Sequence, residues 1–319
     1  MKVKNNILKS KTPFLLVWVY DSLKLMFRFF FKRYPISKPY NFTNPFFIIG
    51  SGRSGNTLLR SLLVSGNEVS IPPESYVLPR VYRRYKVLSF LKWDVLSSIV
   101  VSEFEAYKEY YTWEANLYKA HQKTRAFNKN EKSLAHILNA IYTSYSEPTG
   151  INIKRWGDKT PINTIFIDKI ARIFPKAQYI HIIRDPRDVV CSYVKANLYD
   201  DYNSALAFWK QANIKAEALK EQLSVSQFIQ LRYEDLVTNP EQELKRVCVF
   251  LNLEYKPEML LFWQNKDSLG DVKYNEHHKN IGNPISTSSI GKWRQILTSE
   301  ESAAIEKSVS DLMFRYQYL

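Results

Sequence analysis

The hydrophobic residues of this chain follow two kinds of pattern. Short, largely apolar runs at residues 45–50, 178–183 and 227–232 have the length of buried strands. Longer segments carry apolar side chains at helical spacing, as in residues 56–65 and 161–174. Strands that alternate with helices predict an α/β fold, in which helices cover both faces of a parallel sheet.

Helix-start signals agree with this alternation. Pro186 has the position typical of a first helical turn and opens a predicted helix that runs to about residue 197. Asn239 and Pro240 are expected to be the N-cap and first residue of another helix. Thr298 followed by Glu301 has the spacing of a capping box and predicts the start of a C-terminal helix.

Composition divides the chain into two parts. With 319 residues it is long enough for one large domain, and no Gly- or Ser-rich linker interrupts residues 41–319. We therefore expect one α/β domain there, preceded by a basic, aromatic segment of residues 1–40. Within the domain, residues 80–150 are rich in aromatic and charged side chains and are mostly helical in pattern.

Residues 14–31 form an apolar and aromatic stretch that raises the question of a membrane segment. Asp21, Lys24 and Arg28 interrupt it, so the longest uncharged run is too short to span a bilayer. No small-residue cleavage site follows, which argues against a signal peptide. On a helix the three charges share one face, which allows two alternatives. The helix lies on an anionic membrane surface, or it packs on the domain.

The charge of the chain is strongly positive, with a formal net charge of +14. Residues 1–40 hold nine basic residues and one acidic residue, a net +8, so the body is only moderately basic. That balance suits an anionic small molecule, and no nucleic-acid-binding module is recognisable. The two cysteines, Cys191 and Cys248, lie in apolar helical patterns and are expected to be reduced, which favours the cytoplasm.

The first chemical motif is GSGRSGNT, residues 50–57, between a predicted strand and a predicted helix. Glycines let several backbone N–H groups point at one anion, and the helix N-terminus adds its dipole. Asn56 stands where a Walker A loop needs its lysine, and a cation is present earlier, at Arg53. The motif therefore favours a phosphate-binding loop over a kinase site. The alternative is a Gly-rich turn that binds nothing.

The second motif is IIRDPRDVVCSY, residues 182–193. Arg184 follows the last residue of a predicted strand, where open α/β sheets bind ligands. Ser192 lies about two turns into the next helix, so the two side chains are candidates to bind a second phosphate. The structural alternative for Arg184 is a salt bridge with Asp185 or Asp188.

At these two motifs the chain resembles the sulfotransferases that use 3′-phosphoadenylyl sulfate (PAPS), and most of all their tyrosylprotein sulfotransferase branch and its bacterial relatives. The resemblance extends over most of residues 45–295, with residues 80–150 and the first 40 unmatched. Further matching segments are RSGNTLLRSLL, PPESYVLPR, GDKTP, LRYEDLVTNPE and IGKWR.

This resemblance implies a P-loop-type fold, PAPS as co-substrate, PAP (3′-phosphoadenosine 5′-phosphate) as product, and no metal. It implies that residues 80–150 cover the acceptor side. Glu74 matches the general base, and Arg53 and Lys159 match the cations that face the transferring group. The cofactor-binding residues would be Arg53, Ser54, Gly55, Asn56 and Thr57 at the 5′-phosphosulfate, Arg184 and Ser192 at the 3′-phosphate, Tyr233 near the adenine, and Lys292.

The chain also departs from the family pattern. Asn56 replaces the first of two threonines, although backbone N–H donation survives that change. Ala196 stands where the tyrosine-specific enzymes place another phosphate-binding arginine, and the neighbouring Lys195 is a candidate to compensate. Ser75 and Tyr76 replace acceptor-facing residues. The acceptor therefore stays open among a saccharide, a small molecule and a protein tyrosine.

Two other functions compete with this interpretation. A P-loop kinase would need the Walker lysine that Asn56 replaces. A non-enzymatic basic membrane-peripheral protein would use the loop only structurally. Among the histidines, His181 lies inside a predicted strand and is expected to be a core residue. The pair His277–His278 lacks a third ligand at useful spacing, so no metal site is expected there.

Overall fold

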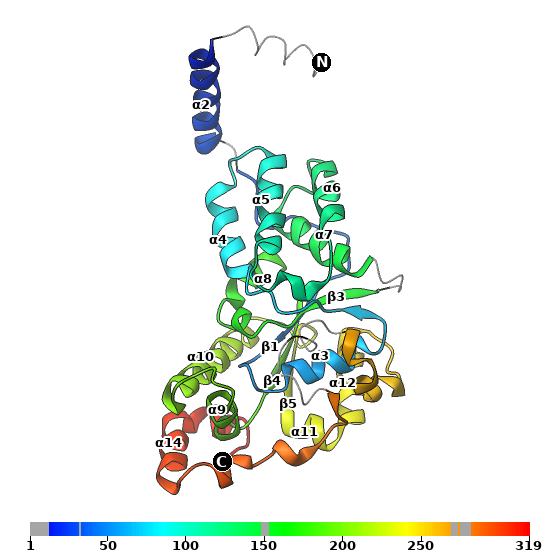
Figure 1. The fold of residues 1–319 in the computed structure, drawn as a ribbon, viewed down its shortest axis with the longest axis vertical. Helices are drawn as coiled ribbons and strands as arrows, with labels where there is room; N and C mark the ends of the chain where they lie inside the picture. Colours follow the sequence, from blue (N-terminus) through cyan, green and yellow to red (C-terminus); the bar gives the residue numbers. More distant parts are fainter. Residues whose placement is uncertain (1–12, 32, 148–152, 269–273, 275–281) are drawn as a thin grey trace.

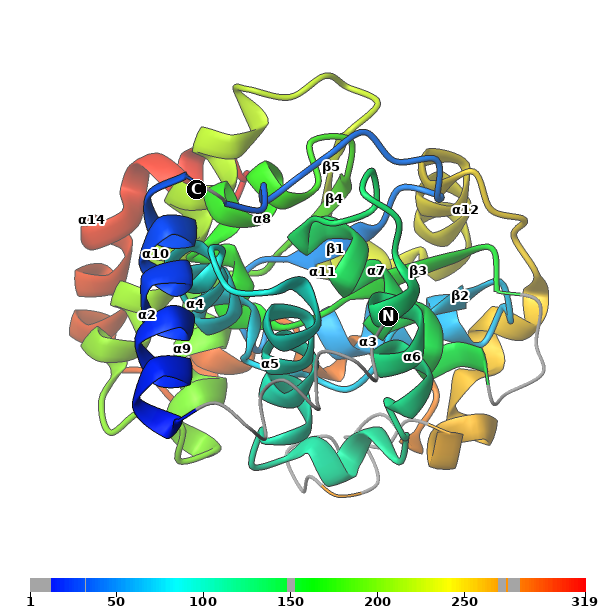
Figure 2. The same cartoon turned by 90° about the horizontal axis from the view of Figure 1, so that it is seen from above.

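The computed structural model describes residues 13–31, 33–147, 153–268, 274 and 282–319. Its centre is one parallel sheet of five strands in the order β2-β3-β1-β4-β5 (Figures 1 and 2). The strands are β1 (Phe46–Ile49), β2 (Val69–Ser70), β3 (Arg155–Asp158), β4 (Gln178–Ile183) and β5 (Phe228–Arg232).

The apolar runs form strands because both faces of the sheet are covered. Every residue of β1 is buried, and its side chains alternate between two separate cores. Phe47 and Ile49 face one core, while Phe46 and Ile48 face the other. This is the pattern of a parallel strand with helices on both sides. It confirms the expected α/β class.

Helices follow the strands largely where the start signals predict them. The helices around the sheet are α3 (Asn56–Val64), α8 (Ile167–Ile173), α9 (Pro186–Lys195), α10 (Tyr202–Lys220), α11 (Tyr233–Thr238), α12 (Pro240–Leu251) and α14 (Ser299–Arg315). Pro186 opens α9, and Thr298 and Glu301 form the predicted capping box of α14. Asn239 stands at the N-cap of α12, but its side chain makes no capping hydrogen bond.

Three features differ from the sequence-based expectations. Residues 161–174 are not one helix, because a 3-10 turn at Pro161–Thr164 precedes α8. The strands β2 and β3 lack an apolar run, and the long helix α10 was not predicted although its buried residues recur at helical spacing. In β3 the reason is a buried polar residue. Arg155 donates to the carbonyl oxygens of Asn44 and Leu251 at 2.7 Å each, so its charged side chain belongs to the interior.

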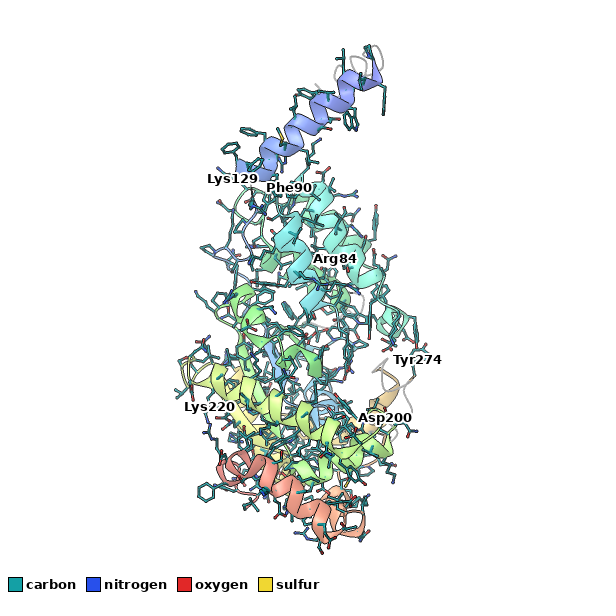
Figure 3. All side chains as sticks on the ribbon, turned by 90° about the vertical axis from the view of Figure 1, so that its left-hand side faces the viewer. Arg84, Phe90, Lys129, Asp200, Lys220 and Tyr274 are labelled. Carbon is teal, nitrogen blue, oxygen red and sulfur yellow. The ribbon has the colours of Figure 1, made fainter. Side chains whose placement is uncertain are left out.

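A helical insertion lies between β2 and β3. It consists of α4 (Leu78–Leu88), α5 (Trp93–Glu105), a 3-10 turn at Tyr110–Trp113, α6 (Tyr118–Ala126) and α7 (Leu134–Ser146). Figure 3 shows the insertion, with Arg84 and Phe90 labelled, stacked along the long axis on the layer that contains Lys220. The helical pattern expected for residues 80–150 is therefore present.

The N-terminal helix α2 (Phe14–Phe31) projects from the insertion (Figure 1). None of its residues is buried. Its last turn contacts the loop between α4 and α5, where Arg28 donates to the carbonyl oxygens of Phe90 and Leu91 at 2.7 Å each. The helix does not pack along the domain. Within the described ranges, no helix has both the length and the apolar character that crossing a bilayer requires.

Candidate active site

The phosphate-binding loop lies between β1 and α3, as its motif predicts. Gly50 and Gly55 both have positive φ, at 137° and 97°. A Cβ on Gly50 would overlap the carbonyl oxygen of Ile182, and one on Gly55 would lie 2.5 Å from the ring of Tyr233. Both positions therefore require glycine. The loop backbone runs close to β4 and to the start of α11.

Asn56 has a structural task that a Walker lysine could not perform. Its amide Nδ2 donates to the carbonyl oxygen of Ser51 at 2.7 Å, across the loop. The hydroxyl oxygens of Ser51 and Ser54 lie 2.8 Å apart and add a second bond across it. The Asn56 side chain is buried. The loop is closed by its own polar side chains.

Arg53 joins the two sequence motifs. Its backbone has φ 64°, in the left-handed region, and its Nε donates to the hydroxyl of Ser192 on α9 at 3.0 Å. Arg184 donates from Nη1 to the carbonyl oxygen of Arg53 at 3.0 Å. Burial lowers the pKa of Arg53 from its ordinary value. Arg53, Arg184 and Ser192 are thus brought together, as the candidate assignments require.

A buried ion pair brings three further candidate residues together. Lys159 Nζ lies 2.5 Å from Glu74 Oε1 and donates to the hydroxyl of Thr57 at 3.1 Å. The Lys159 side chain is fully buried, and that of Glu74 is 17 % exposed. An ammonium removed from water needs such partners, because an unpaired charge would cost several kcal/mol or more there. Lys159 therefore links α3 to the segment that carries Glu74.

The residues after Glu74 have an unusual backbone and contact the insertion. Tyr76 has φ 47°, which is rare for an aromatic residue, and its neighbours Ser75 and Val77 are buried. Its ring stacks on Tyr107 of the insertion, with centroids 6.4 Å apart. Partial burial of the phenol, together with the nearby Glu74 carboxylate, raises the pKa of Tyr76 above its ordinary value, although the residue as a whole is 47 % exposed. Two phenols thus stand beside the candidate base.

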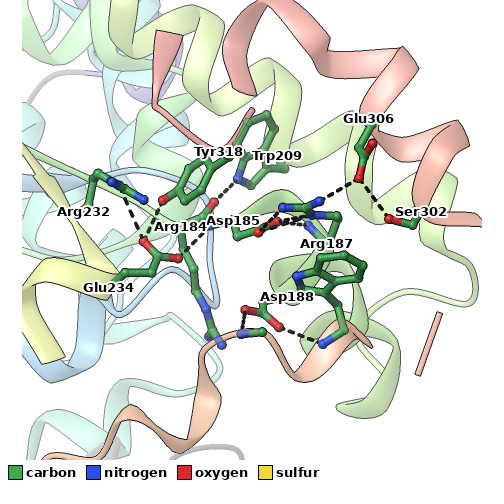
Figure 4. Close-up of polar contacts among 12 residues, drawn as sticks. Arg184, Asp185, Arg187, Asp188, Trp209, Arg232, Glu234, Ser302, Glu306 and Tyr318 are labelled. Atoms are coloured by element: carbon green, nitrogen blue, oxygen red, sulfur yellow. Dashed lines mark hydrogen bonds and ion pairs between the residues drawn. The ribbon is translucent and has the colours of Figure 1, made fainter. Parts of the chain in front are cut away.

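Arg184 makes neither of the salt bridges that were its structural alternative. Asp185 instead pairs with Arg187, and Asp188 accepts bonds from backbone N–H groups (Figure 4). The Arg184 guanidinium lies 4.4 Å from the ring centroid of Tyr233, while its buried Nε has no hydrogen-bond partner among the described residues. A buried cation with an unused donor suits an incoming anion.

The remaining candidates are two exposed lysines and the histidines. Lys292 is exposed on the 3-10 turn Lys292–Gln295, and Lys195 is exposed at the end of α9, next to Ala196. His181 is a core residue, as expected. Its Nε2 lies 3.0 Å from Asn213 Oδ1, and burial lowers its pKa to about 4. His277 and His278 lie outside the described residues.

Both cysteines belong to the protein interior. Cys191 and Cys248 are free and buried, and burial raises their pKa values to about 12 and about 11. In the part of the chain that the structure describes, no three His, Cys, Asp or Glu side chains gather in a way that could hold a metal ion.

Sequence reasoning missed two supporting residues. Thr164 Oγ1 accepts from Gly50 N at 2.9 Å and donates to Gly50 O at 3.0 Å, which fixes the start of the loop. Asp188 binds the backbone on both sides of Lys292. Thr164 follows the GDKTP segment by three residues, so its place near a matched motif was the available signal. For Asp188 the signal was its position as the second aspartate of the sequence RDPRD, residues 184–188.

Comparisons with known proteins identify the family. Residues 45–257 match the Sulfotransferase family. Protein-tyrosine sulfotransferase A of Caenorhabditis elegans is 25% identical over 88% of this chain and 68% of its own length. The omega-hydroxy-beta-dihydromenaquinone-9 sulfotransferase of Mycobacterium bovis is 21% identical over 86% of this chain and 75% of its own. The sulfotransferase domain of the Synechococcus PCC 7002 olefin synthase has the same fold. It aligns with a TM-score of 0.59, 21% identity and coverage of 88% of this chain and 98% of that domain.

The fold and the phosphate-binding loop define a nucleotide-binding α/β enzyme. Because the match covers most of the sheet and both motifs, the chain belongs to the sulfotransferase family and is a sulfotransferase.

The free donor on Arg184 generates a prediction. Arg184→Ala should weaken binding of PAP by roughly tenfold to a hundredfold, since a charge-assisted hydrogen bond contributes about 1.5–3 kcal/mol. Binding of adenosine 5′-phosphosulfate, which lacks the 3′-phosphate, should change much less. Isothermal titration calorimetry with both ligands checks this.

The matched control is Lys210→Ala, which removes an exposed cation of α10, the helix beside α9. It should bind both ligands like the wild type. Equal losses for both ligands in Arg184→Ala would show that this arginine is structural.

Proposed function

We propose that this enzyme transfers the sulfuryl group of PAPS to an acceptor hydroxyl and releases PAP. The observation that carries the proposal is the contact of Lys159 with both Thr57 of the loop and Glu74. It joins the loop expected to bind the donor to the carboxylate expected to activate the acceptor. Residues 41–319 form the catalytic domain in this proposal.

The donor would lie along the carboxyl edge of the sheet. Arg53, Ser54, Gly55, Asn56 and Thr57 would hold the 5′-phosphosulfate with backbone N–H groups and the Arg53 cation. Arg184 and Ser192 would bind the 3′-phosphate, with Tyr233 beside the adenine and Lys292 reaching the nucleotide from the C-terminal part of the chain. The Nε of Arg184 has no partner among the described residues. It and the nearby cations fit a ligand that carries two separate anionic groups.

The chemistry needs positioned charges and one base. In an in-line transfer the bridging oxygen of the donor gains negative charge, which Arg53 and Lys159 are suited to stabilise. The acceptor hydroxyl gives its proton to Glu74 as its oxygen bonds to sulfur. These side chains supply the positive charge that a kinase takes from magnesium. We therefore propose a mechanism without a metal.

A kinase function fits this loop less well. The position of the Walker lysine is occupied by Asn56, whose amide is bonded within the loop. Thermal unfolding with PAP, ATP-Mg and an oligonucleotide separates the sulfotransferase, kinase and nucleic-acid alternatives, because only a true ligand stabilises the fold. Stabilisation by PAP alone is the expected result. Stabilisation by ATP-Mg or by the oligonucleotide alone would contradict the proposal.

The acceptor side is proposed to be the helical insertion, residues 80–150. Tyr107 and Tyr76 stand beside Glu74 and offer ring faces for a sugar or an aromatic acceptor. The relatives named above are a protein-tyrosine enzyme and an enzyme of a hydroxylated menaquinone. A screen with labelled PAPS against tyrosine peptides, polysaccharides, phenols and lipid alcohols identifies the class.

We further propose that α2 binds the anionic inner surface of a membrane and holds a cytoplasmic enzyme there. The exposed side chains of α2 are mostly apolar, and they include Phe14 at 84 % and Trp18 at 59 % exposure. Asp21, Lys24 and Arg28 form one narrow charged stripe along the helix. A helix of this kind, within a segment of net charge +8, has the features of an interfacial anchor.

The proposed base gives the central prediction. Glu74→Gln keeps the size and hydrogen bonding of the side chain but removes its ability to take a proton. The turnover number should fall by about 10²–10⁴-fold, the usual contribution of positioned base catalysis. Steady-state rates with the acceptor found in the screen measure it. The acidic limb of the pH profile should also disappear.

Binding of PAP should change much less than turnover in this variant, because Glu74 contacts the donor loop only through Lys159 and the Gln side chain can still accept its hydrogen bond. Glu109→Gln is the matched control, since its carboxylate bonds to Tyr107 and not to the donor loop. Near wild-type turnover in Glu74→Gln would show that another group is the base.

The exposed face of α2 gives a third prediction. Leu15, Val19 and Met26 lie on the face opposite the charged stripe, and their joint replacement by Ser should abolish binding to phosphatidylglycerol vesicles. Vesicle co-sedimentation measures this, and salt should weaken wild-type binding because part of it is electrostatic.

The control for that experiment is replacement by Ser of three exposed apolar residues elsewhere, Val225, Val249 and Phe314. Their loss should leave vesicle binding unchanged, and both triple variants should bind PAP normally. If the α2 variant still sediments with vesicles, α2 is not the anchor.

A further inference from the structure

The backbone around Lys292 is held by a buried carboxylate. Asp188, in the first turn of α9, accepts from Gly291 N at 2.8 Å with Oδ2 and from Trp293 N at 3.0 Å with Oδ1. The side chain is 3 % exposed. Its two oxygens therefore bind the N–H groups immediately before and after Lys292 (Figure 4).

The backbone and side chains of residues 291–293 fit closely against α9. Gly291 has φ 69°, and a Cβ at this position would overlap the guanidinium of Arg294. Trp293 lies flat against Arg187, whose guanidinium carbon is 4.0 Å from a ring centroid. Arg187 is itself fixed by Asp185 and Glu306. The turn is therefore braced by side chains of α9 on more than one side.

A second contact fixes the backbone two residues before Gly291. Arg184 donates from Nη2 to the carbonyl oxygen of Ser289 at 2.7 Å, while its Nη1 binds the Arg53 carbonyl of the phosphate-binding loop. An anion thus binds the N–H groups of residues 291 and 293, and a cation binds the carbonyl of residue 289. Both come from the motif RDPRD, whose backbone fixes their separation. We call residues 289–293 the lysine turn.

We propose that Asp188 is a positioning residue that holds the lysine turn so that the Lys292 ammonium meets the donor nucleotide. The inference rests on the proposed function, in which Lys292 contacts PAPS. Lys292 is exposed and its long side chain has many rotamers, so its contribution depends on a fixed backbone. A carboxylate with two backbone N–H bonds supplies that fixed point. Asp188 then acts on the nucleotide only through Lys292.

A double-mutant cycle tests this dependence. Lys292→Met should weaken PAP binding by about tenfold, the effect of one exposed charge contact. Asp188→Asn keeps the shape of the side chain but turns one acceptor into a donor, and it should produce a similar loss. If Asp188 acts through Lys292, the double variant should be no weaker than either single variant. Calorimetric titration of the full chain with PAP provides all four values.

Two further variants guard against an unfolded protein. Gly291→Ala disturbs the same turn without touching α9, and in this background Lys292→Met should have no further effect on PAP binding. Glu241→Gln removes an exposed carboxylate of α12 that pairs with Lys245 and contacts neither the lysine turn nor α9. It should bind PAP like the wild type. Thermal unfolding of each variant identifies any that has lost its fold.

The outcomes separate this inference from the proposed function. Losses that multiply in the double variant would overturn the positioning role, because they would mean that Asp188 and Lys292 act independently. Unchanged PAP binding in Lys292→Met would overturn it as well. In both cases the donor site still stands if Arg184→Ala loses PAP selectively. Failure of the wild type to bind PAP would overturn the proposed function itself.

Discussion

The parallel arrangement of β3, β1 and β4 is the constraint on which the rest of the site depends. Parallel strands bring their carboxyl ends to one edge of the sheet, so the residue after each strand faces the same region. Gly50 follows β1, Lys159 follows β3, Arg184 follows β4 and Tyr233 follows β5. Residues far apart in the sequence thus meet without any long loop to position them. The register of the sheet assembles the candidate donor site.

This convergence concentrates positive charge, and the structure compensates for it in two ways. Lys159 is paired with Glu74 and bonded to Thr57, so its buried ammonium has nearby oxygen partners. Arg184 is satisfied by carbonyl oxygens and by the face of Tyr233, which leaves its Nε unused. A paired cation is stable without a ligand, whereas an unused buried donor gains free energy when an anion arrives. The two cations therefore differ in how much free energy each would gain from a bound anion.

The sequence predicted those parts of the fold whose signals are local. The strands β1 and β4, the start of α9 at Pro186 and the capping box at Thr298 all appear where hydrophobic runs or capping residues place them. The strand β3 was missed because its sequence, RWGD, mixes charge, aromatic and glycine. Arg155 is buried there only because carbonyl oxygens distant in sequence surround its guanidinium. Such partners exist only in the folded chain, so no local pattern reveals them.

The candidate site likewise has one part that local sequence motifs predict and another that depends on contacts between distant residues. Its donor half was predictable because phosphate binding needs glycines and cations at fixed spacing beside strands, and these stand in the sequence as two motifs. Its proposed acceptor half lies at an insertion that packs through aromatic side chains in no fixed order. Tyr76 shows the difference. A left-handed backbone between two buried neighbours costs on the order of 1–3 kcal/mol, and only the surrounding packing and the stack on Tyr107 hold it. The strain belongs to the tertiary structure, so no local pattern in the sequence reveals it.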